Sequence, residues 1–132
     1  MPRKRRRPKA LADKELENFK NKLLRQKEET WAEIIDDLKH DAREEYQDFI
    51  HMVHDQGDYA LAELKENTVF SFMELKYQEL EEIEQALTRI ESGTYGRCMD
   101  CGGRVGTARL EVMPASVRCR KCQEKLEKFV GI

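Results

Sequence analysis

The chain has 132 residues, of which 38% are charged and 39% hydrophobic, and its mean hydropathy is −0.80. So polar a chain cannot enclose a large globular core, because its charged side chains have to stay in water. Its length allows one domain, or one small domain with an extension. The composition therefore predicts an elongated or partly disordered protein.

The chain begins with a basic tail, residues 1–10, which carries six basic side chains and no acidic one. Asp13, Lys14 and Glu15 follow where the apolar region of a signal peptide would have to begin. No stretch approaches 18 consecutive apolar residues, so a membrane span is not expected. We predict a disordered tail on a cytoplasmic protein, with a nucleic-acid arm or a localisation signal as the alternative interpretation.

Residues 11–92 are expected to form two long helices. Gly57 is the only glycine or proline between Lys9 and Ser92, and the rest is rich in Glu, Lys, Leu, Ala and Gln, which favour helix. Gly57 can end the first helix in the left-handed conformation, and Asp58 can cap the second. These features predict an antiparallel hairpin with its tip at residues 55–60, a rod roughly 50 Å long.

Both predicted helices carry apolar residues at alternating three and four spacings, the seam of a coiled coil. The seam is weakest near Gln26 and Lys27, and Glu66 and Lys76 are polar at two seam positions. The structural alternative is one continuous helix that dimerises in parallel, since a single Gly57 costs a helix only about 1 kcal/mol. The predicted seam residues are Leu16, Phe19, Leu23, Thr30, Ile34, Leu38, Ala42, Tyr46, Phe49 and Val53, then Ala62, Val69, Met73, Leu80, Ile83, Leu87 and Ile90.

Charge is segregated along the chain. Residues 11–94 have a net charge of −12, whereas residues 95–132 have a net charge of +4. An acidic rod is repelled by nucleic-acid phosphates, so the hairpin is excluded as a duplex-binding surface. Either end of the chain could still contact nucleic acid.

The four cysteines form two C-x2-C pairs separated by 17 residues, within residues 93–132. Four thiolates in this pattern can close a tetrahedron around one zinc ion and leave no open coordination position. We therefore predict a structural rather than a catalytic metal in a small C-terminal finger that ends in a short helix. A thiol redox switch is the weaker interpretation, because such chemistry uses one C-x2-C pair on a βαβ frame that this sequence lacks. The predicted ligands are Cys98, Cys101, Cys119 and Cys122.

Basic residues surround the predicted metal site. They can offset the negative charge of a metal bound by four thiolates, or they can contact an acidic protein or a nucleic acid. A zinc module that clamps nucleic acid with this surface and the basic tail is therefore an alternative function. The residues are Arg97, Arg104, Arg109, Arg118, Arg120 and Lys121.

The hairpin, the run from Gly93 to Gly102, Pro114 and the second cysteine pair together resemble the DksA/TraR family of bacterial C4 zinc-finger transcription factors. The likeness is strong over residues 80–125 and weaker back to the tip. The resemblance implies a mainly α fold, a long antiparallel coiled-coil hairpin with a four-cysteine finger. It further implies a non-enzymatic regulator that inserts the hairpin into the secondary channel of RNA polymerase and does not bind DNA sequence-specifically.

The family's tip motif is Asp, one residue, then Ala, and this sequence has Asp58-Tyr59-Ala60. The resemblance implies that Asp58 reaches toward the polymerase active-site region and that Ala60 packs beside it. The predicted polymerase-interacting tip consists of Asp55, Asp58, Tyr59 and Ala60. Tyr59 stands where a basic residue is expected. Arg109 is the candidate interface residue in the finger.

One departure concerns guanosine tetraphosphate. The family's best-known member uses basic side chains for this alarmone, and the positions that we match to them are Leu75, Glu82 and Gln123. None of these is basic, and a polyphosphate needs cations or backbone amides. We therefore expect weak or absent synergy with the alarmone.

Overall fold

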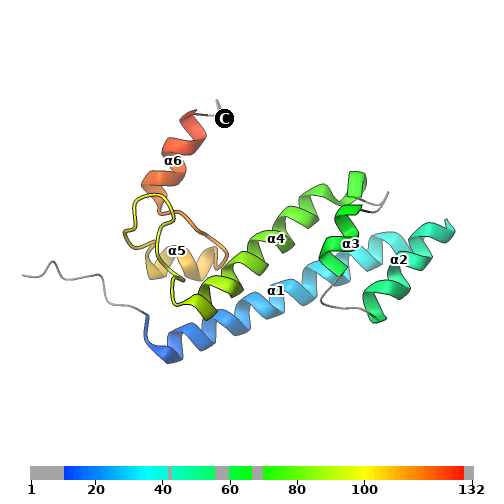
Figure 1. Ribbon diagram of the computed structural model, residues 1–132, viewed down its shortest axis with the longest axis horizontal. Coiled ribbons are helices and arrows are strands. Elements are labelled where there is room, and N and C mark those ends of the chain that lie inside the picture. Colours follow the sequence, from blue (N-terminus) through cyan, green and yellow to red (C-terminus); the bar gives the residue numbers. More distant parts are fainter. Residues whose placement is uncertain (1–10, 42, 56–59, 67–69, 130–132) are drawn as a thin grey trace, which may run out of the picture. The chain divides into compact units, whose positions relative to one another are not determined.

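The computed structural model describes residues 11–41, 43–55, 60–66 and 70–129 (Figure 1). Within these ranges the fold is mainly α, as predicted, and contains one isolated bridge between Arg97 and Arg104 but no strand. The chain divides into two compact units, Leu24–Glu84 and the combination of Met1–Leu23 with Gln85–Ile132. The helices are α1 Asp13–Lys39, α2 Glu44–Asp55, α3 Ala60–Glu66, α4 Phe70–Ser92, α5 Thr107–Val112 and α6 Arg120–Phe129.

Within the unit Leu24–Glu84, α1 and α4 run antiparallel (Figure 1). Lys27 Nζ lies 2.6 Å from Glu84 Oε1, and Lys76 pairs with Glu33. Residue numbers rise along α1 while those of the partners fall along α4, which is the antiparallel order. Two of the polar residues at the weak points of the predicted seam, Lys27 and Lys76, thus form ion pairs between the helices.

The end of α1 and the start of α4 lie at the same level of this hairpin. Glu33 and Lys76 form an ion pair between the two helices. Lys39, the last residue of α1, and Phe70, the first residue of α4, are the same number of residues away from this pair. The rod formed by α1 and α4 therefore stops on both sides together. Beyond that level, α2 and α3 pack against each other.

The core of this unit combines side chains from all four helices. Trp31 packs against it, with its ring centroid 6.5 Å from that of Phe49. Apart from Leu64, every core residue belongs to the seam predicted from the sequence, which confirms the coiled-coil pattern. The buried members are Ile34, Leu38, Tyr46, Phe49, Leu64, Met73 and Leu80.

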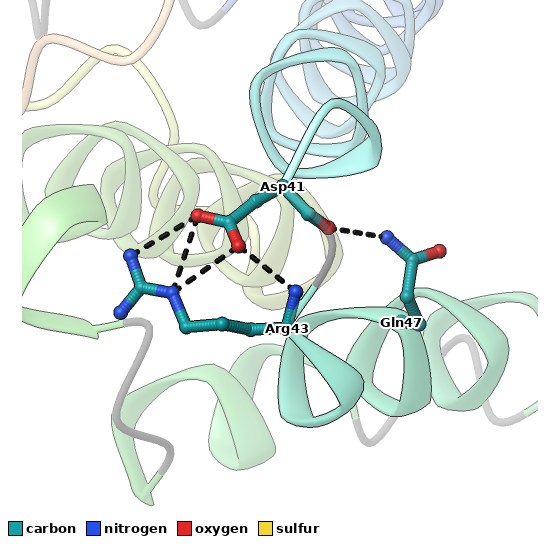
Figure 2. A network of polar contacts seen from close by, with 3 residues as sticks. All are labelled: Asp41, Arg43 and Gln47. Carbon is teal, nitrogen blue, oxygen red and sulfur yellow. Dashed lines mark hydrogen bonds and ion pairs between the residues drawn. The ribbon is translucent and has the colours of Figure 1, made fainter.

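The expectation of one unbroken helix before Gly57 is wrong, because α1 ends at Lys39 and α2 begins at Glu44. Asp41 lies at the break (Figure 2). Its Oδ1 accepts a hydrogen bond from the Arg43 backbone N–H at 3.0 Å, and its carbonyl accepts one from Gln47 Nε2 at 2.7 Å. An aspartate side chain that bonds the backbone two residues on competes with the helix and starts a new one.

The predicted seam also has the wrong register near the tip. Ala62, placed in the seam, is exposed, whereas Ala60 and Leu64 are buried. The prediction extended the period of α4 back through a continuous helix. Met73, inside α4, has the non-helical backbone angles φ −115° and ψ 16°, so the phase of the helix after this kink does not carry over to the residues before it. Ala42 and Val69 lie outside the described residues.

The second unit joins the start of α1 and the end of α4 to α5 and α6. Phe19 of α1 is buried with its ring centroid 5.7 Å from that of Tyr95. Gly93 ends α4 with φ +78°, the left-handed conformation that suits a glycine after a helix. From the last turns of α4, Arg89 donates hydrogen bonds to the carbonyls of Thr94 and Arg97. These contacts fix the start of the cysteine-containing segment on the helices.

The helices of the described ranges include none that is both long and apolar enough to span a membrane.

Candidate metal centre

The first cysteine pair lies in a tight loop. The Cys98 backbone N–H donates to the Gly103 carbonyl at 2.7 Å, and the Gly102 N–H donates to the Cys98 carbonyl at 3.0 Å. Gly102 has φ +73°, so a side chain at this position would strain the backbone. The loop turns the Gly103 N–H toward Cys101 Sγ at 3.4 Å. A backbone amide is thus placed at a cysteine sulfur of the first pair.

The second cysteine pair lies at the start of α6. The Gln123 N–H donates to the Cys119 carbonyl at 2.9 Å, which makes the first helical turn. The Met99 N–H donates to the Val117 carbonyl at 2.8 Å and joins the two pairs through the backbone. A helix start and a tight loop are therefore held against each other with one C-x2-C pair on each.

The four sulfur atoms all lie within 4.8 Å of one another. Cys101 Sγ and Cys119 Sγ, which come from different pairs, are 3.9 Å apart. Zinc bound to thiolates at about 2.3 Å in a tetrahedron separates the sulfurs by about 3.8 Å. The residues present therefore fit one zinc ion with four sulfur ligands, and the chain is a structural zinc protein.

The thiols ionise unequally without a metal. Burial opposes ionisation of Cys98, but backbone N–H groups of Cys101, Cys119 and Asp100 outweigh it and lower its pKa to about 6. Hydrogen bonds with Cys119 and then Cys98 raise the pKa of Cys122 to about 12. Four thiolates therefore do not coexist near neutral pH unless a cation neutralises them, and a divalent metal supplies that charge.

Arg109 lies in a hydrogen-bond network that braces the segment between the cysteine pairs. Its Nε donates to Ser116 Oγ at 3.1 Å and to the Arg118 carbonyl at 3.2 Å. Arg118 Nε in turn lies 2.8 Å from Asp100 Oδ2 beside the first pair. Arg109 is half-buried, so this side chain supports the finger from within.

Tyr95 anchors the loop that carries Pro114. Its hydroxyl donates to the Pro114 carbonyl at 2.7 Å, and its ring packs on Phe19. Burial raises the pKa of Tyr95 well above its usual value. The sequence prediction missed this role, and its only signal was a tyrosine between two glycines just before the first cysteine.

Of the predicted tip residues, Asp55 is the exposed last residue of α2 and Ala60 is the buried first residue of α3. Asp58 and Tyr59 lie outside the described residues. The capping role of Asp41 was also missed. Its signal was present, since Asp41 followed three residues later by Glu44 matches a helix-start pattern.

The comparisons with known proteins agree with this site. Residues 93–128 match the family described as prokaryotic dksA/traR C4-type zinc finger. A Caulobacter vibrioides protein named RNA polymerase-binding transcription factor DksA is 34% identical over 116 residues, which are 88% of this chain and 78% of that protein. An Aquifex aeolicus protein described as uncharacterized is 29% identical over 116 residues, 88% of this chain and 79% of its own length.

Two solved structures are similar over most of the chain. One is the RNA polymerase binding protein and transcriptional regulator Dks from Chlamydia trachomatis, with 27% identity, a TM-score of 0.53, and coverage of 91% of this chain and 95% of that one. The other is transcription factor DksA2 from Pseudomonas aeruginosa, with 25% identity, a TM-score of 0.59, and coverage of 91% and 88%. The likeness includes both the helical hairpin and the finger.

Proposed function

Because the chain belongs to the DksA/TraR family of C4-type zinc-finger proteins, we propose that it regulates transcription by binding RNA polymerase directly. The observation that carries this proposal is the similarity to a protein named for RNA polymerase binding, which extends over 88% of the chain. A similarity confined to the finger would have supported only a zinc module. This proposal places the protein in the cytoplasm, where the polymerase works.

The hairpin is the element that we assign to the secondary channel. Its paired helices α1 and α4 make a rod, and residues 11–94 carry a net charge of −12. An acidic rod is attracted into a basic pore that admits nucleotides. The proposed tip consists of Asp55, Asp58, Tyr59 and Ala60, with the carboxylate of Asp58 perturbing the magnesium-dependent site of the polymerase.

We assign the zinc ligands as Cys98, Cys101, Cys119 and Cys122. The role that we assign to the ion is structural rather than catalytic. Four thiolates fill the coordination sphere, so neither a water nor a substrate has a position on the metal. When bound, the ion supplies positive charge and a crosslink between the two cysteine pairs. The chain on this account is a regulator and not an enzyme.

Synergy with guanosine tetraphosphate is expected to be weak. Leu75 is 77% exposed and offers no charge, and Glu82 is acidic. Burial, with neighbouring Glu79 and Glu81, raises the pKa of Glu82. This cluster of carboxylates repels a polyphosphate. A transcription assay with and without the alarmone tests the point, and a large added effect would contradict it.

The two alternatives find less support. For nucleic-acid binding, Arg109 already forms hydrogen bonds within the finger, Arg118 is paired with Asp100, and Arg120 Nε lies 3.1 Å from Glu124 Oε1. For a redox switch, the four sulfurs form a single cluster and not two separate dithiols. Both facts favour a zinc module that leaves partner binding to the hairpin.

The test uses the full chain, purified with its zinc, and purified core RNA polymerase. We expect binding at micromolar concentration or tighter and a change in transcription from a sensitive promoter. Asp58→Asn should keep binding but lose the transcriptional effect, because it removes one charge without changing size. Asp48→Asn, an exposed aspartate within α2, is the matched control and should keep both.

Absence of binding at micromolar concentration would overturn the polymerase proposal as a whole. Full activity of Asp58→Asn would instead overturn only the assigned tip. A crosslinker attached to Asp58→Cys and mapped by mass spectrometry gives the contact directly. Crosslinks outside the secondary channel would contradict insertion while leaving direct binding intact.

A further inference from the structure

The unit that contains the finger has a cavity of about 510 Å³ beside the first cysteine pair. Part of its lining is apolar, formed by Leu11, Leu16, Ile90 and Leu110. Its volume lies in the range of pockets that bind small organic molecules. The zinc ion does not need this space, since none of the four cysteines lines the cavity.

Arg97 and Arg104 supply the charge of this cavity. They face each other across the isolated antiparallel bridge, and both line the cavity. Directly opposite residues of an antiparallel pair have Cβ atoms about 5 Å apart, and like charges in that position destabilise each other. Both side chains are exposed, and among the described residues neither guanidinium forms an ion pair. No acidic residue is part of the cavity lining.

Five glycines form part of the cavity wall. A Cβ atom built on Gly93, Gly102 or Gly106 would meet nothing within 4 Å, so the space beside these residues is empty. All three have positive φ, which a glycine adopts without strain and other residues rarely do. Part of the cavity wall beside the two arginines is therefore backbone that carries no side chain.

We propose that this cavity binds a small anion that carries an apolar group, with Arg97 and Arg104 receiving the negative charge. A carboxylate, phosphate or sulfonate between two guanidinium groups removes the repulsion between them and accepts charge-assisted hydrogen bonds. The apolar part of the ligand lies against the leucine and isoleucine side chains. This binding site is separate from the proposed polymerase-binding tip and does not depend on that function.

The experiment compares two dyes that differ in charge, anilinonaphthalene sulfonate and uncharged phenylnaphthylamine, on the full zinc-loaded chain. We expect saturable fluorescence with both dyes and tighter binding of the sulfonate. Arg97→Gln and Arg104→Gln should each weaken the sulfonate dye roughly tenfold, the loss of one charge-assisted contact, and change the neutral dye less than about twofold. Lys125→Gln, exposed on α6, is the charge-matched control.

Nuclear magnetic resonance locates the dye on the chain. Five glycines line the cavity, and their amide signals should shift on addition of the sulfonate dye while those of α2 stay in place. Thr107→Phe, which places a ring in the cavity, should weaken both dyes. The five glycines are Gly93, Gly96, Gly102, Gly103 and Gly106.

Three results would overturn the proposal. One is unchanged sulfonate affinity in both arginine variants, and another is dye-induced shifts confined to residues outside the cavity. The third is loss of zinc from Arg97→Gln and Arg104→Gln, which would assign the arginines to charge compensation of the thiolates. Zinc content is therefore measured on every variant alongside dye affinity.

Discussion

The unit Leu24–Glu84 and the finger at residues 93–128 are stabilised in different ways. In the first, seven buried side chains from four helices share one core, and ion pairs between α1 and α4 replace apolar contacts where the seam is polar. In the finger, the fold depends on four sulfurs, two tight turns and a few buried hydrogen bonds. Each substitution in a core of many side chains removes part of its stability, whereas removing one ligand abolishes a metal site as a whole.

The largest expected effect is loss of the metal. Cys98→Ser should reduce zinc from one ion per chain to none and unfold the finger, because zinc contributes on the order of 10 kcal/mol to folding of such modules. The helical signal of Leu24–Glu84 should remain. Elemental analysis and circular dichroism measure the two outcomes.

Met99→Ser is the control for this variant. Met99 is 54% exposed in the same loop, and its backbone N–H keeps its bond to Val117 after the change. It should retain one zinc ion. A full equivalent of zinc in Cys98→Ser would contradict the assigned ligands.

Phe49→Ala should have the next largest effect, on the other unit. Phe49 is 2% exposed and contacts Trp31, and removing a buried phenyl ring costs about 3 to 5 kcal/mol of unfolding free energy. Urea unfolding followed by helical signal measures the loss, and zinc content should not change. Leu75→Ala, at a side chain 77% exposed, should stay within about 0.5 kcal/mol of the wild type. Equal losses in the two variants would refute the assigned core.

Tyr95→Phe tests a single buried hydrogen bond in the finger unit. It leaves the Pro114 carbonyl without its tyrosine donor, which should cost about 1 to 2 kcal/mol. Burial raises the pKa of Tyr95, so the folded chain holds this proton more tightly than the unfolded chain. The resulting stability is present below pH of about 10 and is lost as the pH rises above it. Tyr95→Phe should therefore show a shallower loss of stability in alkali, and an unchanged slope would contradict the role of this group.

Asp41→Ala should have the smallest effect, limited to the start of α2. Loss of the bond to the Arg43 N–H should speed amide hydrogen exchange at Arg43 and in the first turn of α2. Side-chain and then backbone hydrogen bonds from Arg43 lower the pKa of Asp41. The stabilisation that the Asp41 carboxylate gives to the start of α2 is therefore present above pH of about 4. It is lost as the pH falls through the lowered pKa. Asp48→Ala, exposed within α2, should leave these exchange rates unchanged, and equal exchange in both variants would argue against the cap.

The sequence by itself determined the fold class, the apolar seam of the helices and the metal. The spacing of apolar residues predicts which face of a helix is buried, and two C-x2-C pairs predict a tetrahedral thiolate site. Both are short sequence patterns, and each of them usually forms one kind of structure. The buried positions of Ile34, Phe49 and Leu80 follow from that periodicity. The close approach of Cys101 and Cys119, which have 17 residues between them, follows instead from the two C-x2-C pairs.

Only the tertiary structure decided where the helices break and what supports the metal site. The end of α1 depends on the Asp41 side chain, whose bond to the backbone outweighs a helix-favouring composition. The seam register changes across the non-helical Met73 of α4. The bond from Tyr95 to Pro114, the bracing role of Arg109 and the meeting of Arg97 with Arg104 at one cavity join residues that no local pattern connects. The chain's high charge excluded a large core from the outset, and folding gave those charges particular partners that composition alone does not specify.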